Sequence, residues 1–186
     1  MLDRTTKMKR KLFILFFTST VLFFLVVNSA VAHQDVFREM GVVSPKSEKP
    51  APGFTLETPT GNSVSLSDYK GKAILLNFWA TWCIPCKKEL PSMQKLYNYL
   101  KKDGIEVIAI SIDRDKKERV KQYIKDYNLT FPVLLDPNQK VRKDYFIMGL
   151  PTSYLIGGDG KLKGFVSGER VWDSAASKKM FSTLVQ

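Results

Sequence analysis

The fold is decided by residues 73–91, which read AILLNFWATWCIPCKKELP. Residues 73–79 are almost entirely apolar, which is typical of a strand covered on both faces. After Cys83, apolar residues recur at helical spacing, so a helix is expected there, closed by Gly104. Cys83 would therefore follow the buried strand and stand at the start of the helix. Unpaired backbone N–H groups and the helix dipole at that position favour a thiolate over a thiol.

The rest of the chain alternates predicted strands with predicted helices. Two hairpins are expected, one around residues 60–62 and one around residues 157–160. Further strands are expected at 105–112 and 131–135, and further helices at 116–126, 136–145 and 172–184. This order predicts an α/β fold with three layers, in which helices flank a mixed central sheet.

Cys83 and Cys86 are the only cysteines in the chain. A structural disulfide framework needs more cysteines, and a loop this small gains little stability from closure. The pair therefore indicates redox chemistry or metal binding. Structural zinc takes four ligands, and the single histidine, His33, lies far from the pair in the sequence, so no metal is expected. In a redox reading Cys83 attacks a partner disulfide, and Cys86, one turn further into the helix, resolves the mixed disulfide.

The amino-terminal residues 1–32 have the layout of a signal peptide or signal anchor. Basic residues precede an uncharged apolar run at 12–27, and Ala30-Val31-Ala32 is a small-x-small cleavage site. If the segment is kept, residues 12–31 are long enough to tether the chain in a membrane. Either way the rest of the chain is expected outside the cytoplasm. Residues 33–50 are predicted to be a linker, and residues 51–186 one domain.

The formal net charge of +11 does not indicate nucleic-acid binding. The basic residues are concentrated before the apolar run or spread among acidic ones, with no basic stripe that carries aromatic side chains. A solvated surface is the simpler interpretation of this charge.

Residues 77–91 closely resemble the active-site run of the thioredoxin superfamily. The sequence Gly149-Leu150-Pro151-Thr152 before a predicted strand strengthens the likeness. The subfamily it is most similar to is the TlpA/ResA-type exported thiol-disulfide oxidoreductases, which includes cytochrome c maturation thioredoxins. The lead-in at residues 51–69, with the run Asp68-Tyr69-Lys70-Gly71-Lys72, also resembles the AhpC/TSA and redoxin branch. The resemblance implies a thioredoxin-like fold with an N-terminal β-hairpin extension and a helical insert.

The resemblance also implies roles for individual residues. Pro151 matches the family's cis-proline, whose loop lies against the cysteine pair. Leu150, Trp82 and Pro85 would line this substrate loop. Glu89 matches a glutamate that tunes the proton affinity of the cysteines. Asn77 stands where many thioredoxins carry an aspartate; since an amide cannot act as a base, this departure strengthens the case for Glu89.

The expected function is reduction of disulfides in exported client proteins, such as apocytochrome c, without a cofactor other than the Cys83–Cys86 pair. A membrane thiol carrier would supply the electrons. Two alternatives remain open: a thiol peroxidase of the peroxiredoxin type, and a copper chaperone. The spacing of Thr81 and Cys83 does not match the peroxidase motif, and the chaperone's distal histidine is missing.

Overall fold

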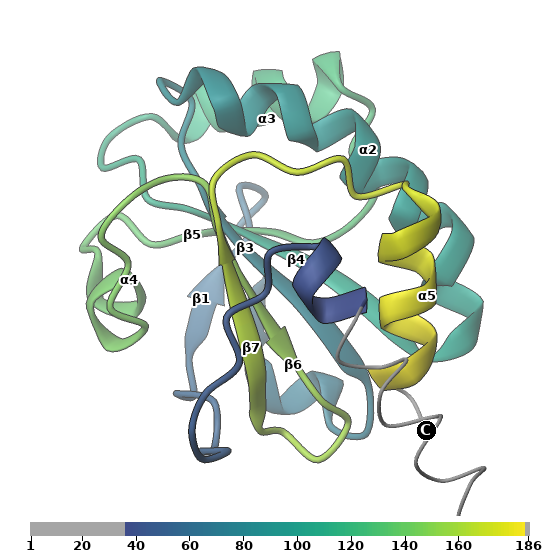
Figure 1. Cartoon of the computed structure of the whole chain (residues 1–186). Coiled ribbons are helices and arrows are strands. Elements are labelled where there is room, and N and C mark those ends of the chain that lie inside the picture. The colour runs from purple at the N-terminus through teal and green to yellow at the C-terminus, as the bar shows by residue number, and fades with distance from the viewer. Residues whose placement is uncertain (1–35, 185–186) are drawn as a thin grey trace, which may run out of the picture.

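A computed structural model describes residues 36–184 and contains a seven-stranded sheet in the order β2-β1-β5-β4-β3-β6-β7 (Figure 1). The strands are β1 (Thr55–Glu57), β2 (Ser63–Ser65), β3 (Ala73–Trp79), β4 (Ile105–Ser111), β5 (Val133–Leu135), β6 (Thr152–Ile156) and β7 (Leu162–Ser167). The helices are α2 (Ile84–Leu100), α3 (Lys117–Asp126), α4 (Lys140–Asp144) and α5 (Ala175–Leu184), with short 3-10 helices at Leu66–Tyr69 and Lys101–Asp103. The predicted α/β class is confirmed.

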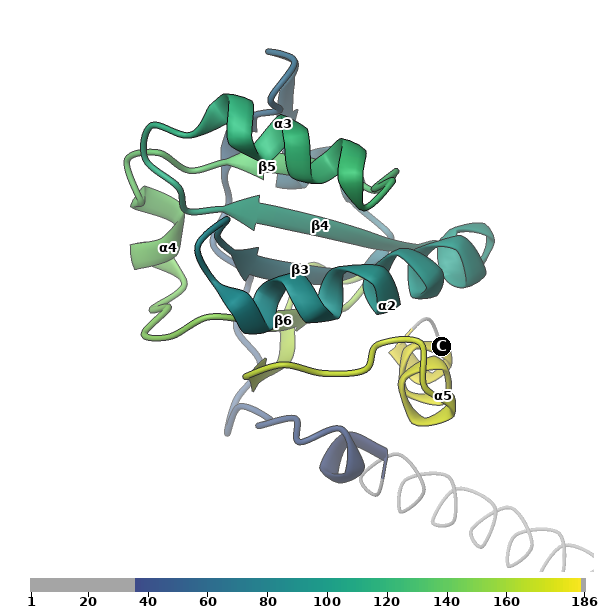
Figure 2. The ribbon, with the colours of Figure 1, turned by 90° about the horizontal axis from the view of Figure 1, so that it is seen from above.

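The centre of the sheet is mixed. Strand β3 pairs in parallel with β4 and antiparallel with β6, and every residue of β3 and β4 is buried. Figure 2 shows the arrowheads of β3 and β4 pointing to the same end of the sheet, where α2 begins and α4 lies. The carboxyl ends of parallel strands are where an open α/β sheet places its site.

Successive residues of β3 face opposite sides of the sheet, and this alternation separates the layers. Trp79 packs edge-on against Tyr123 of α3, with ring centroids 6.1 Å apart. Phe78 points the other way and contacts Tyr145, at the end of α4, at 5.3 Å. Helix α5 lies alongside α2 (Figures 1 and 2), and the Lys178 ammonium of α5 lies 4.7 Å from the Tyr99 ring of α2. The sheet is therefore covered on both faces.

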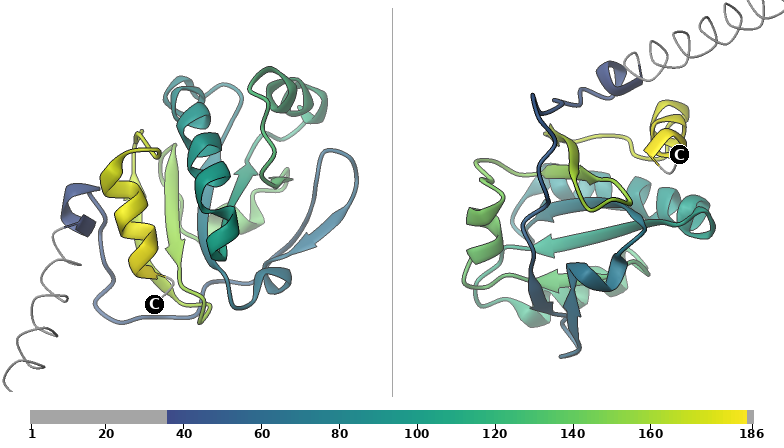
Figure 3. Two further views of the ribbon diagram at one scale, coloured as in Figure 1. Left: turned by 90° about the vertical axis from the view of Figure 1, so that its right-hand side faces the viewer. Right: turned by 90° about the horizontal axis from the view of Figure 1, so that it is seen from below.

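Residues 36–50, predicted to be a linker, pack against the domain. Val36, Phe37 and Met40 are buried. Val43 and Phe165 exchange two backbone hydrogen bonds, of 2.9 and 3.0 Å, so the segment runs along the outer edge of β7 (Figure 3). This described part of the predicted linker is therefore held against the domain by its buried apolar residues and its backbone pairing with β7. The division of the chain at residues 32 and 50 stays a prediction.

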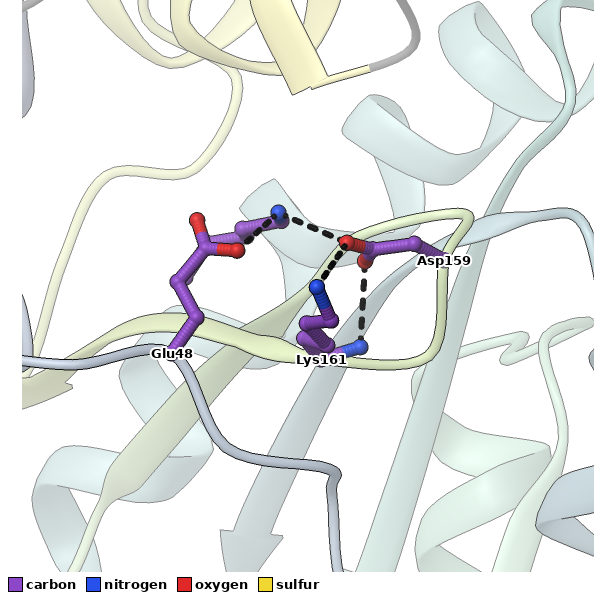
Figure 4. Close-up of polar contacts among 4 residues, drawn as sticks. Glu48, Asp159 and Lys161 are labelled. Atoms are coloured by element: carbon purple, nitrogen blue, oxygen red, sulfur yellow. Dashed lines mark hydrogen bonds and ion pairs between the residues drawn. The ribbon is translucent and has the colours of Figure 1, made fainter.

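An ionic cluster links this segment to the turn between β6 and β7 (Figure 4). The Lys163 ammonium lies 2.9 Å from a Glu48 oxygen and 3.0 Å from an Asp159 oxygen, and Lys161 lies 3.8 Å from Asp159. Pairs as exposed as these contribute little to stability, about 0–1 kcal/mol each. Burial of the apolar residues is therefore the main force that holds the segment.

Two predicted helices begin later than expected. Asp136, expected at the start of one, instead accepts hydrogen bonds from the backbone of Lys140 and Arg142, so α4 begins only at Lys140. The last helix begins at Ala175 rather than at residue 172, because the Ser174 hydroxyl accepts from the Ser177 backbone N–H and caps the helix there. The signal or anchor at residues 1–32, with its tether at 12–31, lies outside the described residues. Within residues 36–184, no helix is long and apolar enough to cross a membrane.

Candidate active site

Cys83 and Cys86 form a disulfide at the start of α2. The Cα atoms are 5.3 Å apart and the sulfurs 2.07 Å. Cys83 is the N-cap residue, and its Sγ accepts a hydrogen bond of 3.2 Å from the Cys86 backbone N–H. Cys83 keeps a small exposed fraction, whereas Cys86 has none. A donor aimed at the Cys83 sulfur is the arrangement that stabilises a thiolate at a helix N-terminus.

The turn that carries Cys83 is held by a buried carboxylate, Asp113. One Asp113 oxygen accepts from the Thr81 hydroxyl at 2.8 Å, and the other accepts from the Thr81 backbone N–H at 2.8 Å. The second oxygen also accepts from the Ser111 hydroxyl at 2.8 Å. The sequence analysis assigns no role to Asp113. Its position just after β4, which pairs with β3, brings it to the turn after β3.

Glu89, the predicted proton-tuning residue, is buried on α2 and satisfied by three N–H donors. Its Oε1 accepts from Asn77 Nδ2 at 2.7 Å. Its Oε2 accepts from Trp172 Nε1 at 3.1 Å and from the Arg170 backbone N–H at 3.2 Å. Glu89 follows Cys86 by three residues, so the two side chains share one face of the helix.

Burial raises the pKa of Glu89 from 4.5 to about 7. The hydrogen bonds from Trp172, Asn77 and the Arg170 backbone act in the opposite direction, and the charge of Glu169 adds a smaller rise. A carboxyl group with a pKa near 7 exchanges protons readily at neutral pH. Glu89 therefore has the proton affinity that a general base in thiol chemistry requires.

The sequence analysis assigns no role to two of the Glu89 donors, Trp172 and Arg170. Helical spacing predicts Trp172 as the first residue of the last helix, but Trp172 lies in the loop before α5. A helix-capping signal would have placed it correctly, because the Ser174 hydroxyl accepts from the Ser177 backbone N–H in the manner of an N-cap. Asn77, in turn, also donates to the Ser153 hydroxyl at 2.9 Å, which links Glu89 to the strand after Pro151.

The Leu150–Pro151 peptide bond is cis, as predicted. The Pro151 carbonyl accepts a 2.9 Å hydrogen bond from Gly168 N–H, which ties this loop to the end of β7. Next to the loop lies a groove of about 470 Å³. The groove is lined by Trp82, Cys83, Ile84, Pro85, Ile112, Gln139, Arg142, Met148, Gly149 and Leu150. The structure thus brings together Cys83 and three residues expected at the substrate loop: Trp82, Pro85 and Leu150.

The cysteine pair has few neighbours that could complete a metal site. Within the described part of the chain, no group of three or more His, Cys, Asp or Glu side chains could hold a metal ion. The pair itself is joined as a disulfide.

Comparison with known proteins agrees with this geometry. A sequence model of the AhpC/TSA family matches residues 47–165. This chain belongs to the AhpC/TSA family. The thiol-disulfide oxidoreductase ResA of Bacillus subtilis (strain 168) is 39% identical over 162 residues, which cover 87% of this chain and 88% of that protein. ResA of Bacillus thuringiensis subsp. konkukian is 43% identical over 122 residues, 66% of this chain and 70% of the relative.

Solved structures give the same assignment. A putative thiol:disulfide interchange protein DsbE from Chlorobium tepidum superimposes with a TM-score of 0.70 at 31% identity. The match covers 77% of this chain and 100% of that chain. The predicted thioredoxin-like, ResA-type resemblance is confirmed, and this member of the AhpC/TSA family is a protein-disulfide oxidoreductase.

Proposed function

We propose that this enzyme works outside the cytoplasm and reduces client disulfides, with Cys83 as the nucleophile and Cys86 as the resolving thiol. The observation that carries the roles of the two cysteines is the contrast between their sulfur atoms. Cys83 lines the groove and receives a backbone N–H, whereas Cys86 is fully buried. A client can therefore reach only Cys83.

In the first step the Cys83 thiolate attacks one sulfur of the client disulfide. A Cys83–client disulfide forms, the client's own S–S bond breaks, and its second sulfur leaves as a thiolate that takes up a proton. The client chain lies in the groove, where Trp82 and Pro85 from the start of α2 and Leu150 from the loop before β6 line the wall beside Cys83.

In the second step the mixed disulfide is resolved from within. Glu89 takes the proton of the Cys86 thiol, and the resulting thiolate attacks the Cys83 sulfur. The Cys83–Cys86 disulfide forms, the mixed disulfide breaks, and the leaving client thiolate takes the proton back from Glu89. Two electrons have then passed to the client, and the enzyme is in the oxidised state described here.

The oxidised enzyme needs two electrons and two protons from a dithiol before it can act again. A membrane thiol carrier fits this need, because exported proteins lie in an oxidising space where disulfides persist. The signal-like residues 1–32 support export. The resemblance of residues 77–91 to the TlpA/ResA-type subfamily, which includes cytochrome c maturation thioredoxins, supports an apocytochrome c Cys-x-x-Cys-His disulfide as the client.

The two-step scheme is tested by trapping. Cys86→Ser is expected to accumulate a mixed disulfide with an oxidised apocytochrome c peptide, whereas the matched Cys83→Ser variant accumulates none. Mass spectrometry under non-reducing conditions measures both. Trapping by Cys83→Ser, or by neither variant, contradicts the roles assigned here.

Direction and reaction class need separate measurements. A reduction potential near −270 mV is expected for a reductase, and one near −120 mV would mark an oxidant. Fast peroxide consumption by reduced Cys86→Ser would instead favour the thiol peroxidase alternative.

A further inference from the structure

Four large apolar side chains are exposed around the groove. Trp82 is 58% exposed, Ile84 63%, Phe146 82% and Met148 92%. Three of them line the groove together with Cys83. Phe146 is two residues before Met148, so the two Cα atoms are at most about 7 Å apart. We call these four residues the apolar rim. Soluble proteins rarely gather exposed apolar side chains in this way unless a partner covers them.

The backbone of Phe146 adds an independent observation. Its φ is +53°, in the left-handed region that a bulky side chain occupies at a cost in free energy. The Phe146 N–H donates to the Lys143 carbonyl, and the Ile147 N–H donates to the Arg142 carbonyl, so Phe146 terminates α4 where glycine or asparagine is favoured. The exposed ring recovers little of this cost through packing. Strain of this kind at the edge of an active site points to a function for the side chain.

The charge of the groove narrows the choice of partner. Among the residues that line it, Arg142 is the one charged side chain, and none is a carboxylate. Its guanidinium donates to the Ile147 carbonyl at 3.3 Å and to the Gln139 side-chain oxygen at 2.7 Å. A basic segment would therefore be repelled from this groove, and an apolar segment would be accepted.

We propose that the apolar rim docks an extended client segment that carries a bulky apolar side chain within about three residues of its reactive cysteine. The inference rests on the proposed function, and it names the class of client that the same site selects. Three residues of the rim line the same groove as Cys83, and Cys83 is bonded to the client in the mixed disulfide. A second copy of the chain or a membrane surface on the rim would cover Cys83 and block the reaction.

The test uses two short disulfide peptides that differ only in leucine or serine beside the cysteines. Phe146→Asn is expected to raise the KM of the leucine peptide about tenfold, because an apolar contact is lost. The KM of the serine peptide stays within about twofold. Met148→Ser gives the same selective loss. The control is Tyr99→Ser, since Tyr99 is 58% exposed at the far end of α2 and should leave both KM values unchanged.

Stability provides the second readout. Asparagine tolerates a positive φ, so Phe146→Asn is expected to raise Tm by about 2–4 °C while it weakens docking. A purely structural Phe146 would lower Tm when replaced, and that result overturns the proposal. The proposal is also overturned if KM changes equally for both peptides. It is overturned as well if the wild-type protein forms a dimer, or binds lipid vesicles, and Phe146→Asn abolishes that association.

The failures of the two proposals can be told apart. If Cys86→Ser traps both peptides but the rim variants leave both KM values unchanged, the proposed function stands and the rim proposal is wrong. If Cys86→Ser traps neither peptide, the proposed function itself is wrong.

Discussion

Glu89 and Asp113 are both buried carboxylates near the cysteine turn, with exposed fractions of 1% and 4%, yet their surroundings differ. Asp113 bonds to Thr81, in the turn itself, and to Ser111, two residues before it. Glu89 is met by Asn77 from β3 and by the loop before α5, more than 80 residues away in sequence. Asp113, which follows β4, therefore holds the turn in place through its hydrogen bonds to Thr81. Glu89 instead lies on α2, the helix that also carries Cys86.

The difference teaches that burial alone does not make a carboxylate useful in catalysis. All three donors to Glu89 are uncharged N–H groups, so they offset only part of the cost of burying its charge. Its pKa therefore settles near neutrality. Its place three residues after Cys86 then brings that proton affinity to the thiol that must be activated. Four predictions test this contrast.

The largest expected effect is on stability as a function of pH. The pKa of Glu89 is raised from 4.5 to about 7 in the folded protein, so the folded state binds this proton more tightly than the unfolded state. The resulting stabilisation is fully present below about pH 4.5 and is lost as the pH rises through about 7, a change of about 3 kcal/mol. In Glu89→Gln the free energy of unfolding should no longer fall as the pH rises through about 7, whereas in Asp113→Asn it should fall as in the wild type. Urea unfolding of the oxidised protein from pH 4 to pH 8 measures it, and equal slopes in wild type and Glu89→Gln would contradict it.

The second effect is on the reaction rate. Glu89→Gln keeps the shape of the side chain but cannot accept the Cys86 proton, so resolution of the mixed disulfide should slow about 100-fold, or about 2.7 kcal/mol. The pH inflection near 7 should vanish with it. Stopped-flow kinetics across pH measure both. As a control, the first attack by Cys83, followed in a Cys86→Ser background, should change much less.

The third effect concerns Asp113. Asp113→Ala leaves the Thr81 N–H and the Thr81 and Ser111 hydroxyls without their acceptor, which should lower the free energy of unfolding by about 2 kcal/mol. The pH inflection of the folded variant should stay near 7. Denaturant titration gives the stability and the pH–rate profile gives the inflection. If the inflection disappeared, the division of roles between the two carboxylates would be wrong.

The smallest effect tests a single donor. Trp172→Phe removes the indole N–H from Glu89 Oε2 but keeps most of the buried ring. Because that bond lowers the pKa of Glu89, its loss should raise this pKa by about one unit, or about 1.4 kcal/mol. The inflection in the pH–rate profile should move by the same amount toward alkaline pH. If the inflection does not move, Trp172 contributes packing only and does not set the pKa of Glu89.

The sequence predicted the local parts of the site well. A buried strand, a turn with Cys83 and a helix with Cys86 are contiguous, so periodicity and capping rules apply to them directly. Pro151 and Glu89 were found through the resemblance to thioredoxins. Asp113, Arg170 and Trp172 were not found, because hydrophobic patterns indicate which residues are buried and are silent on which polar groups meet inside.

The chain's own sequence determined a redox-active cysteine pair at a helix N-terminus, since that chemistry depends on groups within one turn of the helix. The tertiary structure alone decided what surrounds the pair. Packing of the loop before α5 beside α2 places two donors on Glu89. The segment after α4 leaves Phe146 and Met148 exposed, and Met148 lines the groove together with Cys83. These features come from segments far apart in the chain, so they exist only once the sheet and its helices have assembled.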